Sequence, residues 1–336
     1  MKPAFFKSAV GLRPFPEERG ELNAFVRWAG RGHIMGQVAA AHEGEATGKL
    51  KDIVENARIR SAHDRRMLEF EAGRIRRALL GSGIEPVILK GSAYVAKGLR
   101  AGRGRRVSDI DILVPEVYIT KVEELLTVAG WQPELTTASN YDQQYYRKWM
   151  HELPPMRHSK RRTLVDVHHR LLPRTARLQP DHLAIVDTAV PIGEMGVKTF
   201  APRDLFIHSA IHIFADGALE TPARSLIELY YLFDDLNADE RRTLVHRAAE
   251  VGAIKPVRAA LWAVGRYFDD AQAHVVLKSI GPWRMGFVLR ACVKTLVAEN
   301  GFVPFAKLAL YIRSHYMRMP LGLLISHLFK KATRRS

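Results

Sequence analysis

Residues 88–114 read ILKGSAYVAKGLRAGRGRRVSDIDILV, and this stretch decides the fold. It contains two short apolar runs that are separated by a Gly-Ser step and a basic, glycine-rich loop. Asp109 and Asp111 stand one residue apart inside the second apolar run. A carboxylate loses its hydration when it is buried, so two of them in an apolar run need a specific partner.

The segments on both sides of this stretch alternate between helical and strand patterns. Apolar spacing predicts helices over residues 64–80, 91–97 and 117–129, and strands over residues 87–89 and 108–115. The polar RHSKRR at residues 157–162 lies between HELPPM and TLVDVHHRL, a pattern typical of two strands joined by a turn. Asp166 is therefore predicted on a third strand of the same layer.

The organisation of the whole chain follows from where the strand signal ends. Beyond about residue 170 helical patterns dominate. We predict an α+β fold, with a mixed β-sheet flanked by helices and followed by a largely helical C-terminal region. The predicted regions are an N-terminal helical segment over residues 1–60, a core over 61–172, and a mainly helical domain with a basic tail over 173–336.

Composition indicates an ordinary globular protein. Apolar residues make up 47% of the 336 residues and charged residues 26%. The single cysteine, Cys292, can form no internal disulfide, which fits a reducing cytoplasm. Lys7 and Arg13 interrupt any signal-peptide core, and no run approaches the roughly 18 apolar residues of a membrane span. We expect a cytoplasmic protein with no integral membrane contact.

The basic charge indicates an anionic partner without choosing one. The formal net charge is +16, and no acidic residue follows Glu299. Such a tail suits a phosphate backbone or an anionic membrane surface, although a solubilising helical end explains it as well. Nucleic-acid contact and peripheral membrane contact stay open, and neither is favoured. The basic residues after Glu299 are Lys307, Arg313, Arg318, Lys330, Lys331, Arg334 and Arg335.

The two aspartates of the apolar run predict a magnesium site. Side chains at i and i+2 on a strand point to the same face, about 7 Å apart along the chain. Magnesium prefers oxygen ligands, and two such ions about 4 Å apart can clamp an in-line phosphoryl displacement. A third carboxylate would complete the site, and Asp166 on the next predicted strand is the best candidate. Glu116, Glu123 and Glu124 read as helix-surface charges.

The residues around the Gly-Ser step suit the phosphates of a nucleotide. Gly91 permits close backbone approach, and Ser92 at a predicted helix start offers a hydroxyl and backbone N–H groups. Arg105 of the basic loop could neutralise phosphate oxygens, because guanidinium forms charge-assisted bonds with them. Lys90 is either a further phosphate ligand or a solvated strand end. His208 and His212, with Asp216 one turn further on, have a spacing that could hold a metal but suits helix packing better.

Together these patterns resemble the uncharacterised nucleotidyltransferase family of bacteria, within the DNA polymerase beta-like nucleotidyltransferase superfamily. The similar segments are VILKGSAYV, RRVSDIDILV, VDVHH and LFIHSAIHIFADG, in order over about residues 60–235. The resemblance implies a nucleotidyltransferase-type sheet and dependence on a divalent metal. It also implies phosphate binding by Lys90, Gly91, Ser92 and Arg105, metal binding by Asp109 and Asp111, and a metal-ligand or general-base role for Asp166.

The chain departs from the family pattern at two positions. His169 stands where tryptophan is frequent, which leaves the predicted metal ligands unchanged. Glu228 stands where an aspartate is expected, so the family's roles for residues of the helical region are harder to assign to this chain.

Three functions are consistent with the sequence. The first is transfer of a nucleoside monophosphate from a nucleoside triphosphate (NTP) to an unidentified acceptor hydroxyl or phosphate, with two Mg²⁺ ions expected. The second directs the same chemistry at a tRNA-like RNA 3′ end. The third is a non-catalytic binding or scaffold protein that retains the fold, against which the presence of all three carboxylates argues.

Overall fold

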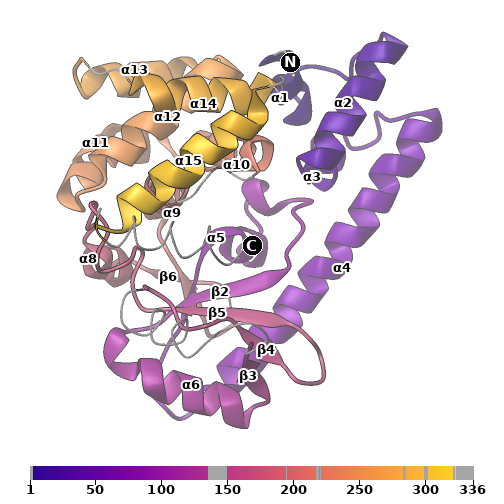
Figure 1. The fold of residues 1–336 in the computed structure, drawn as a ribbon. Helices are drawn as coiled ribbons and strands as arrows, with labels where there is room; N and C mark the ends of the chain where they lie inside the picture. The colour runs from indigo at the N-terminus through magenta and orange to yellow at the C-terminus, as the bar shows by residue number, and fades with distance from the viewer. Residues whose placement is uncertain are drawn as a thin grey trace, which may run out of the picture.

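The computed structural model describes residues 3–134, 150–193, 195–216, 219, 221–282, 285–298, 302–320 and 322. The chain has a mixed β-sheet in one half and a group of helices in the other (Figure 1). Buried apolar side chains from both halves form one continuous cluster. The predicted α+β fold with a helical C-terminal region is confirmed.

The sheet has the strand order β3-β4-β5-β2-β1-β7-β6. Its centre is the parallel pair β2 and β5, flanked by antiparallel β1 on one side and antiparallel β4 on the other. The outer strand β7 runs parallel to β1. The strands are β1 (Val87–Ile88), β2 (Asp109–Leu113), β3 (Trp131–Pro133), β4 (Met156–His158), β5 (Leu164–His168), β6 (Val190–Pro191) and β7 (Lys198–Thr199).

The helices of the sheet half lie around the strands that they connect. In the view of Figure 1, α6 lies below the sheet and α5 above it, while the long α4 crosses beside it. The alternating Ile110 and Ile112 of β2 are buried, as expected for the apolar face of a strand. These helices are α4 (Gly48–Ala78), α5 (Lys90–Ala96) and α6 (Ile119–Val128), with short 3₁₀ turns η1 (Arg100–Gly102) and η2 (Glu116–Tyr118).

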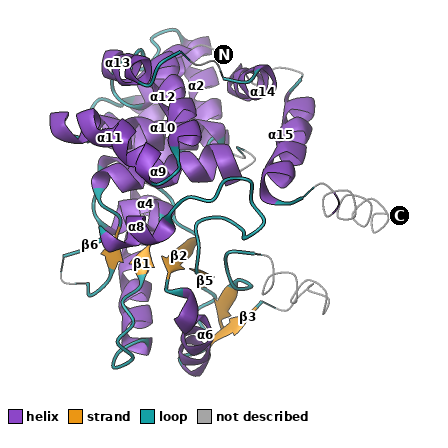
Figure 2. Cartoon of the chain, turned by 90° about the vertical axis from the view of Figure 1, so that its left-hand side faces the viewer, coloured by secondary structure: helices purple, strands orange, loops and turns teal. Residues whose placement is uncertain are grey.

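The helical half packs above the sheet and includes the start of the chain (Figures 1 and 2). Helix α1 contacts α10 and α12, so the first residues complete the helical half instead of covering the sheet. Its elements are α1 (Pro3–Ala9), α2 (Arg19–Arg31), α3 (Met35–Ala41), α8 (His182–Asp187), α9 (Pro202–Ile211), the π-helical turn η3 (His212–Asp216), α10 (Pro222–Asp234), α11 (Ala238–Glu250), α12 (Ile254–Phe268), α13 (Ala271–Ser279), α14 (Phe287–Ala298) and α15 (Val303–Arg318).

The structure refines several of the predicted elements. The helix predicted from residue 64 begins at Gly48, so α4 runs across the predicted region boundary at residue 60. The two-residue strands β6 and β7 fall in the part predicted to be helical, yet they extend the sheet. Strands this short carry no readable periodicity, which explains why the sequence pattern missed them. The division into three regions stays a prediction.

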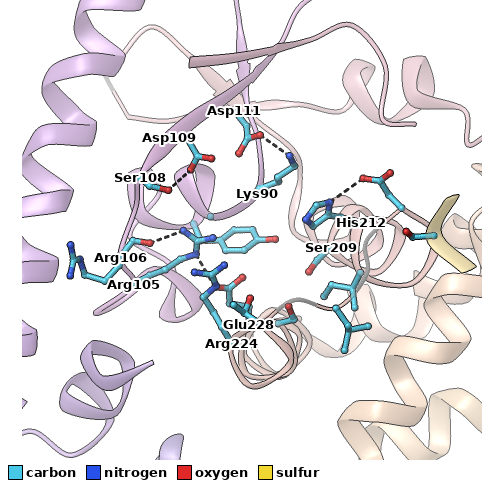
Figure 3. Close-up of a pocket in the computed structure, with 18 of the residues that line it drawn as sticks. Lys90, Arg105, Arg106, Ser108, Asp109, Asp111, Ser209, His212, Arg224 and Glu228 are labelled. Atoms are coloured by element: carbon cyan, nitrogen blue, oxygen red, sulfur yellow. Dashed lines mark hydrogen bonds and ion pairs between the residues drawn. The ribbon is translucent and has the colours of Figure 1, made fainter. Parts of the chain in front are cut away.

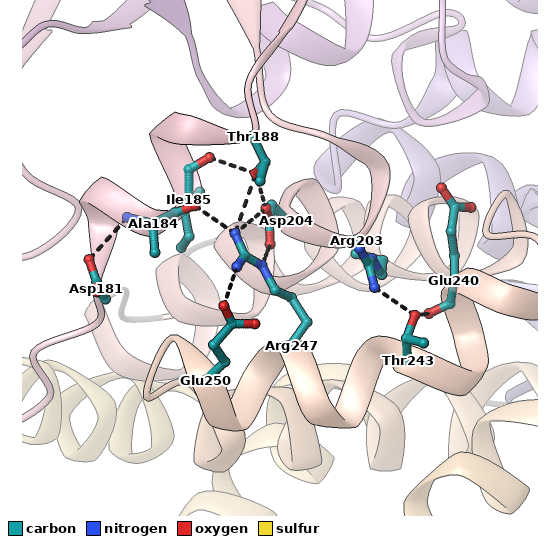
Figure 4. Close-up of polar contacts among 10 residues, drawn as sticks. All are labelled: Asp181, Ala184, Ile185, Thr188, Arg203, Asp204, Glu240, Thr243, Arg247 and Glu250. Carbon is teal, nitrogen blue, oxygen red and sulfur yellow. Dashed lines mark hydrogen bonds and ion pairs between the residues drawn. The ribbon is translucent and has the colours of Figure 1, made fainter.

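A side-chain-lined cavity lies between β2 and the helices α9 and α10 (Figure 3). A buried ion pair joins helices α9 and α11 (Figure 4). Arg247 donates to both oxygens of Asp204 at 2.9 Å and to the carbonyl of Ala184 at 2.7 Å. Thr188 donates a further hydrogen bond of 2.7 Å to Asp204. This network fixes α8, α9 and α11 relative to one another.

Replacing Arg247 by alanine should lower the free energy of unfolding by about 3–5 kcal/mol, because Asp204 would stay buried without its counter-charge. The side chains of Arg247 and Asp204 are only 9% and 3% exposed. Arg242→Ala is the matched control on the same helix, since its side chain is 78% exposed. That control should cost less than about 1 kcal/mol. Urea unfolding measures both, and equal losses in the two variants would contradict the structural role of Arg247.

Candidate active site

Asp109, Asp111 and Asp166 project from one face of the sheet. Asp109 and Asp111 are alternate residues of β2, so their side chains share a face. Asp166 is the direct partner of Asp111 in the parallel pairing of β2 with β5. Neighbouring strands lie about 4.8 Å apart, so the paired carboxylates of Asp111 and Asp166 are close neighbours. The structure thus brings the three predicted acidic residues together.

Asp111 is held by two hydrogen bonds to the same oxygen. Lys90 Nζ donates to Asp111 Oδ1 at 2.7 Å, and His168 Nε2 lies 2.9 Å from that oxygen. Both the lysine and the histidine come from elements adjacent to β2: Lys90 begins α5, and His168 ends β5. Although burial raises the pKa of Asp111, the charge of Lys90 and the bond from His168 hold that pKa far below its usual value. Asp111 is therefore ionised.

The chemistry of this carboxylate group fits a hard divalent cation. Burial, followed by the neighbouring carboxylates of Asp111, Glu152 and Asp109, raises the pKa of Asp166 to about 7. Mutual repulsion of this kind is what a bound cation relieves, and oxygen donors suit Mg²⁺. The described side chains do not bring oxygens of all three aspartates within 4.8 Å of one another, so ion binding would require their side chains to rotate.

The backbone at Lys90 is held in an unfavourable conformation. Its φ is +50°, in the left-handed region that a lysine side chain rarely adopts. The conformation marks the sharp turn from β1 into α5, and Leu89 N–H still pairs with the carbonyl of Asp111 at 2.9 Å. Residues in such regions persist only where surrounding contacts enforce them, and they cluster at functional sites. At this turn the side chain of Lys90 is ion-paired with Asp111.

Gly91 lies against the side chain of Arg105 from the basic loop. A Cβ atom at this position would lie 1.7 Å from Cζ of Arg105, so the guanidinium group occupies the space beside the glycine. Arg105 Nε donates to Glu228 Oε1 of α10 at 2.8 Å, and both side chains are largely buried. Glu228, the departure from the family pattern, is thus one of the residues through which the helical half holds the basic loop.

Ser92 has a role within the protein itself. Its side chain is buried, and its hydroxyl donates to the carbonyl of Asp109 at 2.8 Å. This bond fixes the start of β2 relative to α5. Phosphate binding by Lys90, Gly91, Ser92 and Arg105 stays a prediction.

The cavity beside these residues has a volume of about 460 Å³ and is strongly polar (Figure 3). The sheet half and the helical half each form one of its walls. Asp166 is not among the described residues of the wall and lies beside Asp111 on the next strand. On the sheet side the wall includes Lys90, Gly91, Arg105, Asp109 and Asp111, and on the helical side it includes His212, Asp216, Arg224, Glu228 and Arg318.

The two histidines at helical spacing separate into different environments. His208 is fully buried with its ring perpendicular to that of Phe200. His212 faces the cavity, where its Nδ1 lies 3.6 Å from Asp216 Oδ2 (Figure 3). Because only one of them reaches the cavity, the two histidines do not form a joint metal site.

The other basic residues of the loop and tail differ in the groups that they contact. Arg100 pairs with Asp234 and Asp235 at the end of α10 and so joins the two halves. Arg106 pairs with Asp64 of α4. Arg313 donates to the carbonyl of Phe214, whereas Arg318 lines the cavity. The predicted basic tail, with Lys330, Lys331, Arg334 and Arg335, lies outside the described residues.

Comparison with known proteins identifies the family of this chain. The family model described as uncharacterised nucleotidyltransferase matches residues 21–269. The chain belongs to the uncharacterised nucleotidyltransferase family. Searches of curated proteins and of solved structures gave no match. Membership in this family indicates nucleotidyl transfer as the general activity and a nucleotide as a substrate. In the part of the chain that the structure describes, every helix is too short or too polar to cross a bilayer.

The variant Gly91→Ala should destabilise the protein by about 1–3 kcal/mol, because the new methyl group would displace Arg105 from its 2.8 Å bond to buried Glu228 and leave that carboxylate only the 3.8 Å contact with Arg224 among the described residues. Gly73→Ala in α4 is the matched control, since nothing lies within 4 Å of a Cβ there. The control should be stabilised by about 0.5–1 kcal/mol, the helix-propensity gain of alanine over glycine. Opposite signs in urea unfolding would confirm the close packing, and a stabilised Gly91→Ala variant would refute it.

Proposed function

We propose that this chain is a Mg²⁺-dependent nucleotidyltransferase that moves a nucleoside monophosphate from an NTP to an acceptor hydroxyl or phosphate. The observation that carries the proposal is the register of β2 and β5, which places Asp111 opposite Asp166 and Asp109 on the same face. The polar cavity begins at Asp109 and Asp111 and has cationic side chains along its wall.

The reaction requires one bond to form and one to break at the α-phosphorus. An acceptor oxygen would attack this phosphorus, and the bond to the oxygen that bridges to the β-phosphate would break. Pyrophosphate leaves with its electron pair, and an acceptor hydroxyl gives up its proton to a carboxylate or to water. Bound Mg²⁺, held by Asp109, Asp111 and Asp166, would supply charge stabilisation for the attacking and leaving oxygens.

The residues of the sheet half would bind the donor nucleotide. Lys90 and Arg105 present positive charge on the same side of the cavity as the carboxylates, which suits the phosphates of an NTP. Arg105 is fixed by Glu228 and Lys90 by Asp111, so both cations are positioned before the nucleotide arrives. Prepositioned charge of this kind contributes to catalysis because no reorganisation is needed during the reaction.

The positions of Asp166 and of the helical wall suggest their roles in the reaction. Asp166 would act as the third metal ligand or accept the proton of an acceptor hydroxyl, since it lies directly beside Asp111. The acceptor would then contact the helical wall, which includes His212, Arg224 and Arg318.

The proposal predicts a nucleotide-dependent rise in melting temperature that requires Mg²⁺. A ligand present at 100 times its Kd stabilises the native state by about 2.7 kcal/mol. The four ribonucleoside triphosphates, each with and without Mg²⁺, should therefore separate into a donor that shifts the melting temperature and others that shift it less. The absence of any shift at saturating nucleotide would favour the non-catalytic scaffold function.

Asp109→Asn should abolish the Mg²⁺-dependent part of this shift and leave the melting temperature of the free protein nearly unchanged. The only described side-chain bond of Asp109 comes from Ser108 next to it, whereas Asp111 holds buried groups whose loss would disturb the fold. Asp239→Asn, at an exposed carboxylate of α11, is the control and should keep the full shift. A full shift in Asp109→Asn would remove this residue from the site.

A further inference from the structure

Behind Asp111 lies a second group of potential ligands that the proposed reaction does not use. His151 and Glu152 precede β4, and an isolated antiparallel bridge pairs Glu152 with His168 at the end of β5. One ligand atom from each of these three residues lies within 4.8 Å of the other two. His151 and His168 are buried, and Glu152 is partly buried. This is the one such group of three that the described residues contain.

The spacing of these atoms suits a tetrahedral metal ion. Zinc binds imidazole nitrogen and carboxylate oxygen at about 2.1 Å, which places tetrahedral ligands about 3.4 Å apart. His168 Nδ1 lies 3.3 Å from Glu152 Oε2, and His151 Nε2 lies 4.0 Å from the same oxygen. The two rings are 5.3 Å apart between centroids and inclined by 35°. The shorter separation matches the tetrahedral value, and the longer one exceeds it by about 0.6 Å.

The surroundings of His168 match those of a metal-bound histidine. A metal-ligating imidazole commonly donates its other ring N–H to a carboxylate, which fixes the tautomer and orients the ring. His168 has this arrangement, because Nε2 lies 2.9 Å from Asp111 Oδ1 while Nδ1 faces Glu152. His151 is likewise buried, and because its Nδ1 has no hydrogen-bond partner among the described residues, no bond at that atom holds the ring in its present orientation.

The donor set separates this group from the aspartates. Two imidazoles and one carboxylate favour borderline cations such as Zn²⁺, whereas a set of aspartate oxygens favours Mg²⁺. We propose that His151, Glu152 and His168 form a second metal site, specific for a borderline divalent cation, that is joined to the candidate active site through the bond from His168 to Asp111. An ion bound there would hold His168, and through it the orientation of Asp111. This inference does not depend on the proposed transfer reaction.

The test is Zn²⁺ binding by the full chain after removal of metals with a chelator. Calorimetric titration with Zn²⁺ alone, together with elemental analysis of the dialysed protein, should give one ion per chain. His151→Ala and Glu152→Gln should each weaken binding at least about tenfold, because each removes a ligand. His246→Ala is the matched control, since this exposed histidine of α11 is remote in sequence from the group. Circular dichroism of each variant confirms that it is folded.

Two further variants distinguish this site from the aspartate site. Asp109→Asn should leave Zn²⁺ affinity unchanged, although it should abolish Mg²⁺-dependent nucleotide binding. Asp111→Asn should weaken Zn²⁺ binding by about 10–100-fold through the lost support of His168. The inference is overturned if the wild-type chain binds no Zn²⁺, if folded His151→Ala binds it as tightly as wild type, or if Asp109→Asn removes binding. Unchanged Zn²⁺ affinity in Asp111→Asn would overturn the link between the two sites.

Discussion

The structure depends on two neighbouring carboxylates on the central strands of its sheet, of which Asp111 is buried and Asp166 is half-buried. Asp111 and Asp166 are direct partners on β2 and β5, and the ionised forms repel each other in a region with little water. Positive charge must therefore be brought to them. Lys90 supplies part of it through an ion pair, at the cost of a left-handed backbone at the start of α5. The remaining repulsion favours a divalent cation, which is the physical basis of the proposed chemistry.

The helical half contributes residues to the candidate active site. Glu228 of α10 reaches across to Arg105, and the guanidinium of Arg105 lies on Gly91 beside Lys90. The position of the proposed phosphate-binding residues thus depends on a residue more than 100 positions later in the chain. The cavity wall is shared between both halves, so residues of the helical half line the same space as the aspartates of β2.

The sequence was sufficient to predict elements with local signals, but long-range contacts were beyond it. Alternating residues predicted β2 with Asp109 and Asp111 on one face, and the run around Asp166 predicted β5. The direct pairing of Asp111 with Asp166 depends on strand register, which the sequence does not show. No sequence pattern indicated Glu152 as a ligand, because its position beside His168 depends on a single bridge between two segments. Gly91 was predicted to permit close approach, and the structure shows that Arg105 makes that approach.

The most direct test of the account is a crystal structure of the chain with Mn²⁺ and a non-hydrolysable analogue of the NTP that stabilises it. The anomalous scattering of Mn²⁺ locates the ions independently of the nucleotide. Mn²⁺ should be bonded to Asp109 and Asp111, with Asp166 as a ligand or within hydrogen-bond distance of an atom that binds the ion. The triphosphate should lie in the cavity against Lys90 and Arg105. Nucleotide bound elsewhere, or Mn²⁺ without contact to the β2 aspartates, would contradict it.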